Sequence, residues 1–123
     1  MSVSPARANL EQVMTPQAYA HMDGLAARLA VGLQRVIDQY EVPWHVVRVG
    51  ARVEFICAPG PLRNGTEAEA AHAPALEQAI HLALLNRSCL IAPFHNMMLV
   101  SPATTAAQVA MLCDAFESVT ASL

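Results

Sequence analysis

One amphipathic helix, ending near residue 40, constrains the fold of this 123-residue chain more than any other feature. Thr15 followed by Pro16 is a typical helix start, because threonine caps the first turn and proline is tolerated in it. Apolar residues then recur at steps of three and four: Met22, Leu25, Ala26, Leu29, Leu33, Val36, Ile37 and Tyr40. Pro43 marks the end of the helix. Such a helix needs a second layer to cover its apolar face.

Two short strands are predicted after the helix, at His45–Val49 and Arg52–Cys57, on either side of Gly50. Because side chains alternate along a strand, the second strand has two different faces. One face carries Val53, Phe55 and Cys57, and the other carries Arg52, Glu54 and Ile56. The first face is the predicted core. We expect the face with Arg52 and Glu54 to be solvated or to contact another domain.

The second half of the chain repeats this alternation of helix and strands. Turn residues fill 59–65, and Pro74 opens a helix that runs to about Arg87. Strands are predicted at Cys89–Ala92 and Asn96–Val100. Thr105 and Gln108 then form a capping-box pattern for a last helix. The predicted buried side of that helix is Val109, Leu112, Cys113, Phe116 and Val119.

This order predicts an α+β domain, with three main helices packed on one face of a small, mainly antiparallel sheet. We assign residues 11–123 to this domain and residues 1–10 to a flexible leader. No apolar run approaches the ~20 residues of a membrane helix. The opening residues lack the apolar stretch of a signal peptide, which favours a cytoplasmic protein.

Composition excludes several classes of partner and site. The net charge of −3 and the scattered arginines give no basic stripe for nucleic acid. The histidines and cysteines lack metal-ligand spacing, so no metal site is predicted, and no glycine-rich phosphate loop occurs. Hydrophobic residues make up 54% of the chain and charged residues only 14%. Some apolar surface is therefore expected to face a partner, and we predict a homo-oligomer.

All seven basic residues are arginines, and the chain has no lysine. Pyridoxal phosphate binds its enzymes through a Schiff base with a lysine amine. The chain cannot form that bond at any side chain. We therefore predict no cofactor and no catalytic residue in this chain itself.

Three stretches in the same order resemble the closing segment of a known family. They are MTPQAYAHMDGLAARLAVGL (Met14–Leu33), VGARVEFICAPGPLRNGTEAE (Val49–Glu69) and IHLALLNRSCLIAPFHNMMLVSPATT (Ile80–Thr105). Together they are similar to the C-terminal small domain of class III pyridoxal-phosphate aminotransferases of the glutamate-1-semialdehyde aminomutase type. The likeness extends from about Asn9 to Leu123.

The resemblance implies a parent enzyme in which a large domain holds pyridoxal phosphate, its lysine and its phosphate site. The small domain packs on that domain and contributes a loop to the substrate side of the cleft. The matching loop here is Pro93–Met97, with His95 and Asn96 as its polar members. By this resemblance the chain is a part of an aminotransferase and is inactive alone.

Two departures from the family pattern bear on the reaction of the parent. Many amine transaminases carry an arginine where this chain has Ala92, and aminomutases usually carry a glutamate in the loop where it has His95 or Asn96. The expected parent is therefore an aminotransferase acting on an amino acid. Arg87 is a possible carboxylate contact, since a guanidinium binds carboxylates bidentately.

Each candidate residue also has an ordinary structural interpretation. Arg87 lies near a helix C-terminus, which favours a cation whatever the function. His95 can satisfy backbone groups in a turn. For the whole chain the alternative is a free-standing dimeric α+β binding or regulatory module. The Phe94–Met98 loop and the outward side of Arg52–Cys57 would then contribute to its dimer interface.

Overall fold

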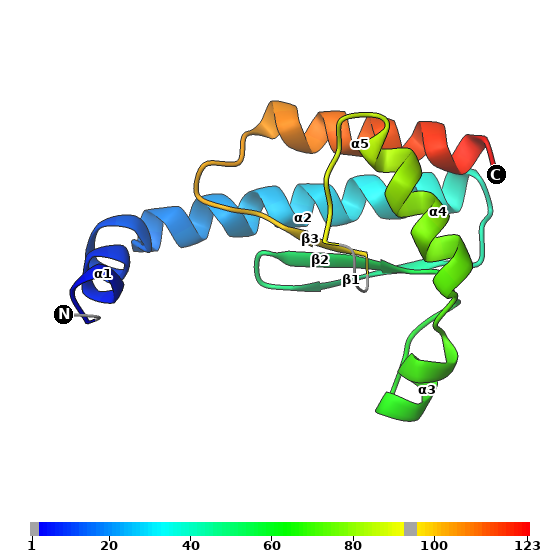
Figure 1. Cartoon of the computed structure of the whole chain (residues 1–123), viewed down its shortest axis with the longest axis horizontal. Helices are drawn as coiled ribbons and strands as arrows, with labels where there is room; N and C mark the ends of the chain where they lie inside the picture. The colour runs from blue at the N-terminus through cyan, green and yellow to red at the C-terminus, as the bar shows by residue number, and fades with distance from the viewer. Residues whose placement is uncertain (1–2, 93–95) are drawn as a thin grey trace.

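The longest helix of the chain, α2 (Pro16–Gln39), lies along a three-stranded sheet (Figure 1). The computed structural model describes residues 3–92 and 96–123. The backbone amide of Ala18 donates a hydrogen bond of 3.1 Å to the Thr15 hydroxyl, which confirms the predicted cap. The predicted apolar face is buried from Met22 to Ile37, so α2 forms the centre of the core.

The sheet consists of β1 (His45–Val49), β2 (Arg52–Ile56) and β3 (Met97–Leu99), in the order β1-β2-β3. Both strand pairs are antiparallel, and Arg52 lies opposite Val49 on one side and Leu99 on the other. Val53 and Phe55 are buried, as the alternation along β2 predicts. The α+β class with an antiparallel sheet is therefore confirmed.

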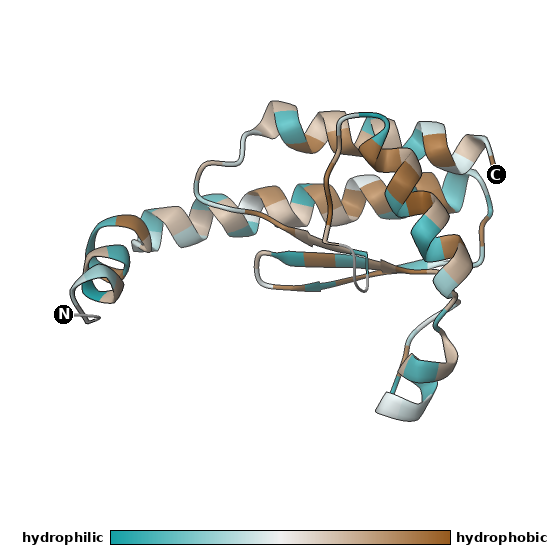
Figure 2. Cartoon of the chain, viewed as in Figure 1, coloured by the Kyte–Doolittle hydropathy of each residue, from teal (hydrophilic) through white to brown (hydrophobic). Residues whose placement is uncertain are grey.

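The last helix, α5 (Ala106–Ala121), packs beside α2 and runs in the same direction (Figure 1). Its predicted capping box is present: Gln108 N donates to the Thr105 hydroxyl (3.2 Å), and Thr105 N donates to the Gln108 side chain (2.9 Å). Helix α4 (Pro74–Leu85) contacts α5. Figure 2 shows that hydrophobic residues dominate α4 and recur along α2 and α5.

Three aromatic rings join the sheet to the helices. The ring of Phe55 on β2 lies 4.9 Å from that of Phe116 on α5, measured between centroids. Trp44 lies 6.2 Å from Phe55 and 6.3 Å from Phe116. All three side chains are buried. Since the ring of Phe116 packs against those of Phe55 and Trp44, this cluster ties the first half of the chain to the last helix.

The prediction of a strand at Cys89–Ala92 is wrong. The backbone amides of Ser88 and Cys89 donate to Leu85 and Leu84, at 3.0 and 2.9 Å, and Ser88 has a left-handed φ of 65°. This is a Schellman-type ending of α4. Only Ala92 of this segment bonds toward β3, from its amide to the Met97 carbonyl (2.9 Å). The segment is instead anchored by the buried side chains of Cys89 and Ile91.

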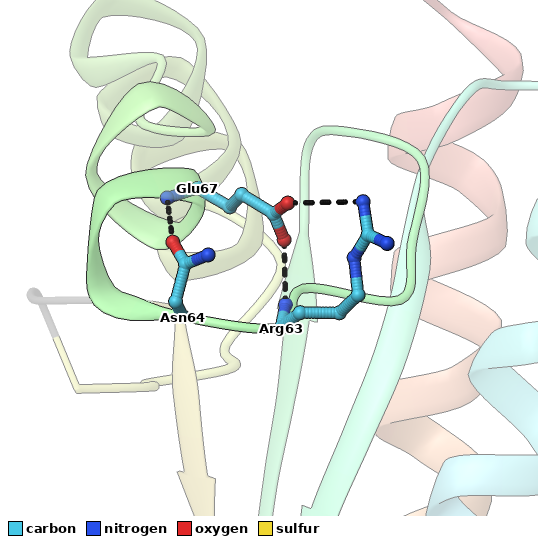
Figure 3. Close-up of polar contacts among 3 residues, drawn as sticks. All are labelled: Arg63, Asn64 and Glu67. Atoms are coloured by element: carbon cyan, nitrogen blue, oxygen red, sulfur yellow. Dashed lines mark hydrogen bonds and ion pairs between the residues drawn. The ribbon is translucent and has the colours of Figure 1, made fainter.

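Short helices flank the core. Residues before α2 form α1 (Val3–Ala8) and the π-helix η1 (Asn9–Val13), and α3 (Gly65–Ala70) follows the 59–65 turn. In α3 the Glu67 amide donates to Asn64 Oδ1 (2.9 Å), while the Glu67 carboxylate accepts from the Arg63 amide (2.7 Å) and guanidinium (3.2 Å) (Figure 3). No helix among the described residues is long and apolar enough to cross a membrane.

Candidate functional site

Asn96 directly precedes β3 and is buried, with 3% of its surface exposed. Its φ of 51° is left-handed, a conformation that asparagine tolerates better than most residues. Its side-chain amide donates a long hydrogen bond of 3.5 Å to the Phe55 carbonyl on β2. Asn96 therefore anchors one end of the predicted loop to the sheet. His95, the other polar residue predicted there, lies outside the described residues.

Arg87 lies beyond the end of α4 and bonds to two helices. Its Nη1 donates to the Ala83 carbonyl (3.0 Å) and its Nε donates to the Ser118 hydroxyl on α5 (3.2 Å). The first bond agrees with the interpretation of a cation at a helix C-terminus. Arg87 bonds to Ser118 on α5, and Asn96 bonds to Phe55 on β2. These two candidate residues are not hydrogen-bonded to each other.

The side of the sheet turned away from α2 forms an exposed surface, which we call the open sheet face. Three of its apolar side chains are exposed: Val47, Val49 and Leu99. On the central strand, the guanidinium of Arg52 and the carboxylate of Glu54 form an ion pair with a distance of 2.9 Å. Figure 1 shows α2 and α5 on the other side of the sheet. On this face, exposed apolar side chains therefore lie beside one ion pair.

A hollow of about 360 Å³ borders the open sheet face, next to α3 and α4. Its polar lining includes Glu54, Glu69, His72 and Glu77. The Nδ1 atom of His72 lies 3.3 Å from the Glu77 carboxylate. Among the described residues, no three histidine, cysteine or acidic side chains are placed to hold a metal ion. The sequence patterns gave no signal for this hollow, because its walls come from three separate elements.

The thiols are unsuited to nucleophilic catalysis. Burial and, to a smaller extent, the nearby Glu77 carboxylate raise the pKa of the Cys57 thiol to about 12. Burial also raises the pKa of Cys89 and of Cys113. Because the thiolate is the reactive form, all three cysteines are poor nucleophiles at neutral pH. Cys89 is buried, whereas Cys57 and Cys113, which the sequence places on predicted buried faces, are half-buried.

The residues of this chain do not fit pyridoxal phosphate as a resident group. The sequence has no lysine for an aldimine. The polar hollow described above is lined by carboxylates, which repel a phosphate. No step of a pyridoxal-phosphate reaction is assigned to a side chain of this chain alone.

Solved structures identify the fold. A glutamate-1-semialdehyde aminomutase from Pseudomonas aeruginosa PAO1, in complex with PMP, superimposes with a TM-score of 0.93 and 43% sequence identity over 95% of this chain. A second structure of this aminomutase gives a TM-score of 0.89 at the same identity. The chain is a class III aminotransferase small domain, of the glutamate-1-semialdehyde aminomutase-like branch. No family model and no curated protein matches the chain.

More distant aminotransferases share the fold of this small domain. A β-phenylalanine aminotransferase from Variovorax paradoxus has a TM-score of 0.84 at 22% identity, over 94% of this chain and 26% of its own length. An omega-transaminase from Sphaerobacter thermophilus has a TM-score of 0.73 at 21% identity, over 88% of this chain and 25% of its own length. The small domain likewise spans only 26% of the Pseudomonas aminomutase in complex with PMP, and 25% of the other.

Proposed function

We propose that this small domain serves a pyridoxal-phosphate-dependent aminotransferase, by docking on a large domain and contributing the Pro93–Met97 loop to its substrate side. The single observation that carries the proposal is the 43% identity to the aminomutase over 95% of the chain. Because the chain has no lysine to form a Schiff base with the cofactor, we infer that it is inactive alone. The open sheet face supports docking, because it offers exposed apolar side chains around one ion pair.

Within the complete enzyme the candidate residues have different tasks. Asn96 fixes the base of the loop through its bond to the Phe55 carbonyl. His95 is then the polar residue to test for contact with substrate. Arg87 remains a candidate carboxylate contact, although two of its nitrogens already bond to Ala83 and Ser118. We further propose that the parent acts on an amino acid, since the family glutamate is replaced by His95 or Asn96, and that it works in the cytoplasm.

Cofactor binding is the first test. The chain is mixed with pyridoxal phosphate, reduced with borohydride and analysed by intact mass. We expect no stoichiometric adduct on an internal residue, because only the N-terminal amine is available. An adduct at one internal site, or a stable yellow complex of the chain alone, would contradict the proposal.

Docking is the second test, with the large domain of the Pseudomonas aminomutase expressed without its own small domain. We expect the chain to bind it and to restore amino transfer. Val49→Glu places a charge on the open sheet face, where Val49 is 71% exposed, and is expected to abolish binding without unfolding the domain. Leu82→Glu is the matched control, because Leu82 is 56% exposed on α4. Absence of binding by the unmodified chain would favour a free-standing module instead.

A further inference from the structure

A groove of about 540 Å³ runs between α2 and α5 and is lined by residues of these two helices alone. We call it the outer groove. Its floor is made of small side chains, because Gly32 on α2 lies directly against Cys113 on α5. Val31 stands on its α2 wall with 70% of its surface exposed.

The two walls of the outer groove carry opposite charges. Arg28 and Arg35 line the α2 wall, and Asp114 lines the α5 wall. None of these three side chains forms an ion pair with another described residue. The charges are therefore available to a molecule that fills the groove, and that molecule needs an acidic edge opposite α2 and a basic edge opposite α5.

A second copy of the small domain has that charge pattern, and its charged residues lie at nearly the same position along the helix axes. Gly32 on α2 and Cys113 on α5 lie at the same height along the two helices, because they are in contact. Asp114 is one residue beyond Cys113, and Arg35 is three residues beyond Gly32. At 1.5 Å per residue, these two positions differ by about 3 Å along the helices. Both helices run in the same direction (Figure 1). A two-fold axis parallel to the helices therefore places α2 of each copy on α5 of the other. Arg35 of each copy then lies opposite the partner's Asp114, which gives two symmetric pairs.

We propose that the outer groove is a homodimer interface, in which Val31 packs over the small residues of the partner's α5 and Arg35 pairs with the partner's Asp114. The face formed by α2 and α5 is about 24 Å long and about 20 Å wide, from helix rise and diameter. Two such faces bury about 1,000 Å², which is the lower end for a specific interface. The expected dimer is therefore weak, with dissociation in the micromolar range.

The test is a charge swap measured by sedimentation equilibrium, from about 1 to 100 µM, below and above the dissociation constant expected of so small an interface. Arg35→Asp replaces the proposed pair by two acidic side chains, and Asp114→Arg replaces it by two basic ones. Each single variant is expected to weaken the dimer by about tenfold or more. The double variant Arg35→Asp/Asp114→Arg restores opposite charges at the proposed pair, and its dissociation constant is expected to return to within about threefold of the unmodified value. Arg7→Asp, outside the groove, is the matched control.

This inference goes beyond the proposed function, and its failure has a separate signature. A chain that is monomeric at every concentration would overturn it, as would a double variant that stays monomeric although its thermal unfolding is unchanged. A dimer that is broken by Val49→Glu and not by the charge variants would move the interface to the open sheet face and would also overturn it. None of these results depends on binding of the large domain.

Discussion

The sulfur of Cys113 lies 2.6 Å from the position that a β-carbon on Gly32 would occupy. Real β-carbons do not approach other atoms this closely, so helices α2 and α5 touch at a distance that only glycine permits. Val109 and Phe116 on α5 are buried on either side of this contact along the helix. The glycine therefore sets how far the last helix can enter the core.

Gly32→Ala is expected to lower the free energy of unfolding by about 1–3 kcal/mol, since the added methyl group forces Cys113 to move. Gly24→Ala is the matched control in the same helix, because a β-carbon there meets nothing within 4 Å. This control is expected to stabilise the domain by about 0.5–1 kcal/mol, through helix propensity. Urea unfolding measures both. Equal effects of the two substitutions would show that the helix contact is looser than described.

Truncation of Phe116 tests the aromatic cluster. Phe116→Ala removes the ring that lies 4.9 Å from Phe55, and is expected to cost about 3–5 kcal/mol. Met111→Ala on the same helix serves as the control, because Met111 is half exposed, and a change within about 0.5 kcal/mol is expected. Denaturant unfolding followed by the fluorescence of Trp44 reports both values. If Phe116→Ala lowered the free energy of unfolding no more than Met111→Ala does, the aromatic cluster would not be part of the stabilising core.

The left-handed backbone of Asn96 gives a graded prediction. Asn96→Ala loses the bond to the Phe55 carbonyl and strains a φ of 51°, for a combined cost of about 2–3 kcal/mol. Asn96→Gly loses only the bond, since glycine adopts this φ freely, and is expected to cost about half as much. Thermal unfolding of the two variants distinguishes them. An Asn96→Ala variant at least as stable as Asn96→Gly would mean that the left-handed backbone conformation is not a source of strain.

The Cys57 thiol predicts a decline of stability in alkaline solution. Its pKa in the folded chain is raised to about 12, against about 8.5 for an unfolded cysteine. Below pH 8.5 the thiol is neutral in both the folded and the unfolded chain, and its contribution to the free energy of unfolding is fully present. Between pH 8.5 and 12 only the unfolded chain loses the proton, so the free energy of unfolding falls as pH rises. Urea unfolding of Cys57→Ala from pH 7 to 10 is expected to show a shallower decline, and identical slopes would contradict the assignment.

Features that depend on neighbouring residues were predictable from the sequence. The Thr15 cap and the Thr105–Gln108 capping box are confirmed, because each depends on residues within one helical turn. The strand predicted at His45–Val49 is confirmed, and the one predicted at Arg52–Cys57 is confirmed with its end at Ile56, since a short turn at Gly50 joins the two. Arg87 donates to a carbonyl of α4, as its place near the helix end indicates.

Features that depend on tertiary packing were not predictable. Cys89 and Ile91 are buried while Leu90 is exposed, and this alternation is typical of a strand. The sequence does not show that the amides at the start of this segment bond back to α4. Asn96 is a polar residue directly before Met97 and Met98, and only the three-dimensional structure shows that its side chain turns inward to β2. The hollow around Glu77 and His72 requires α4 to be placed against the sheet first.

The arrangement of α2, β1 and β2 also affects the order in which this polypeptide acquires its structure. These three elements are consecutive between Pro16 and Ile56 and all contact one another. Closing them requires only short loops, whereas β3 and α5 must return from the far end of the chain. During translation α2, β1 and β2 are therefore synthesised before β3, and one side of β2 stays unpaired until Met97–Leu99 is available. During that interval β2 is an exposed edge that a chaperone or a neighbouring nascent chain can engage.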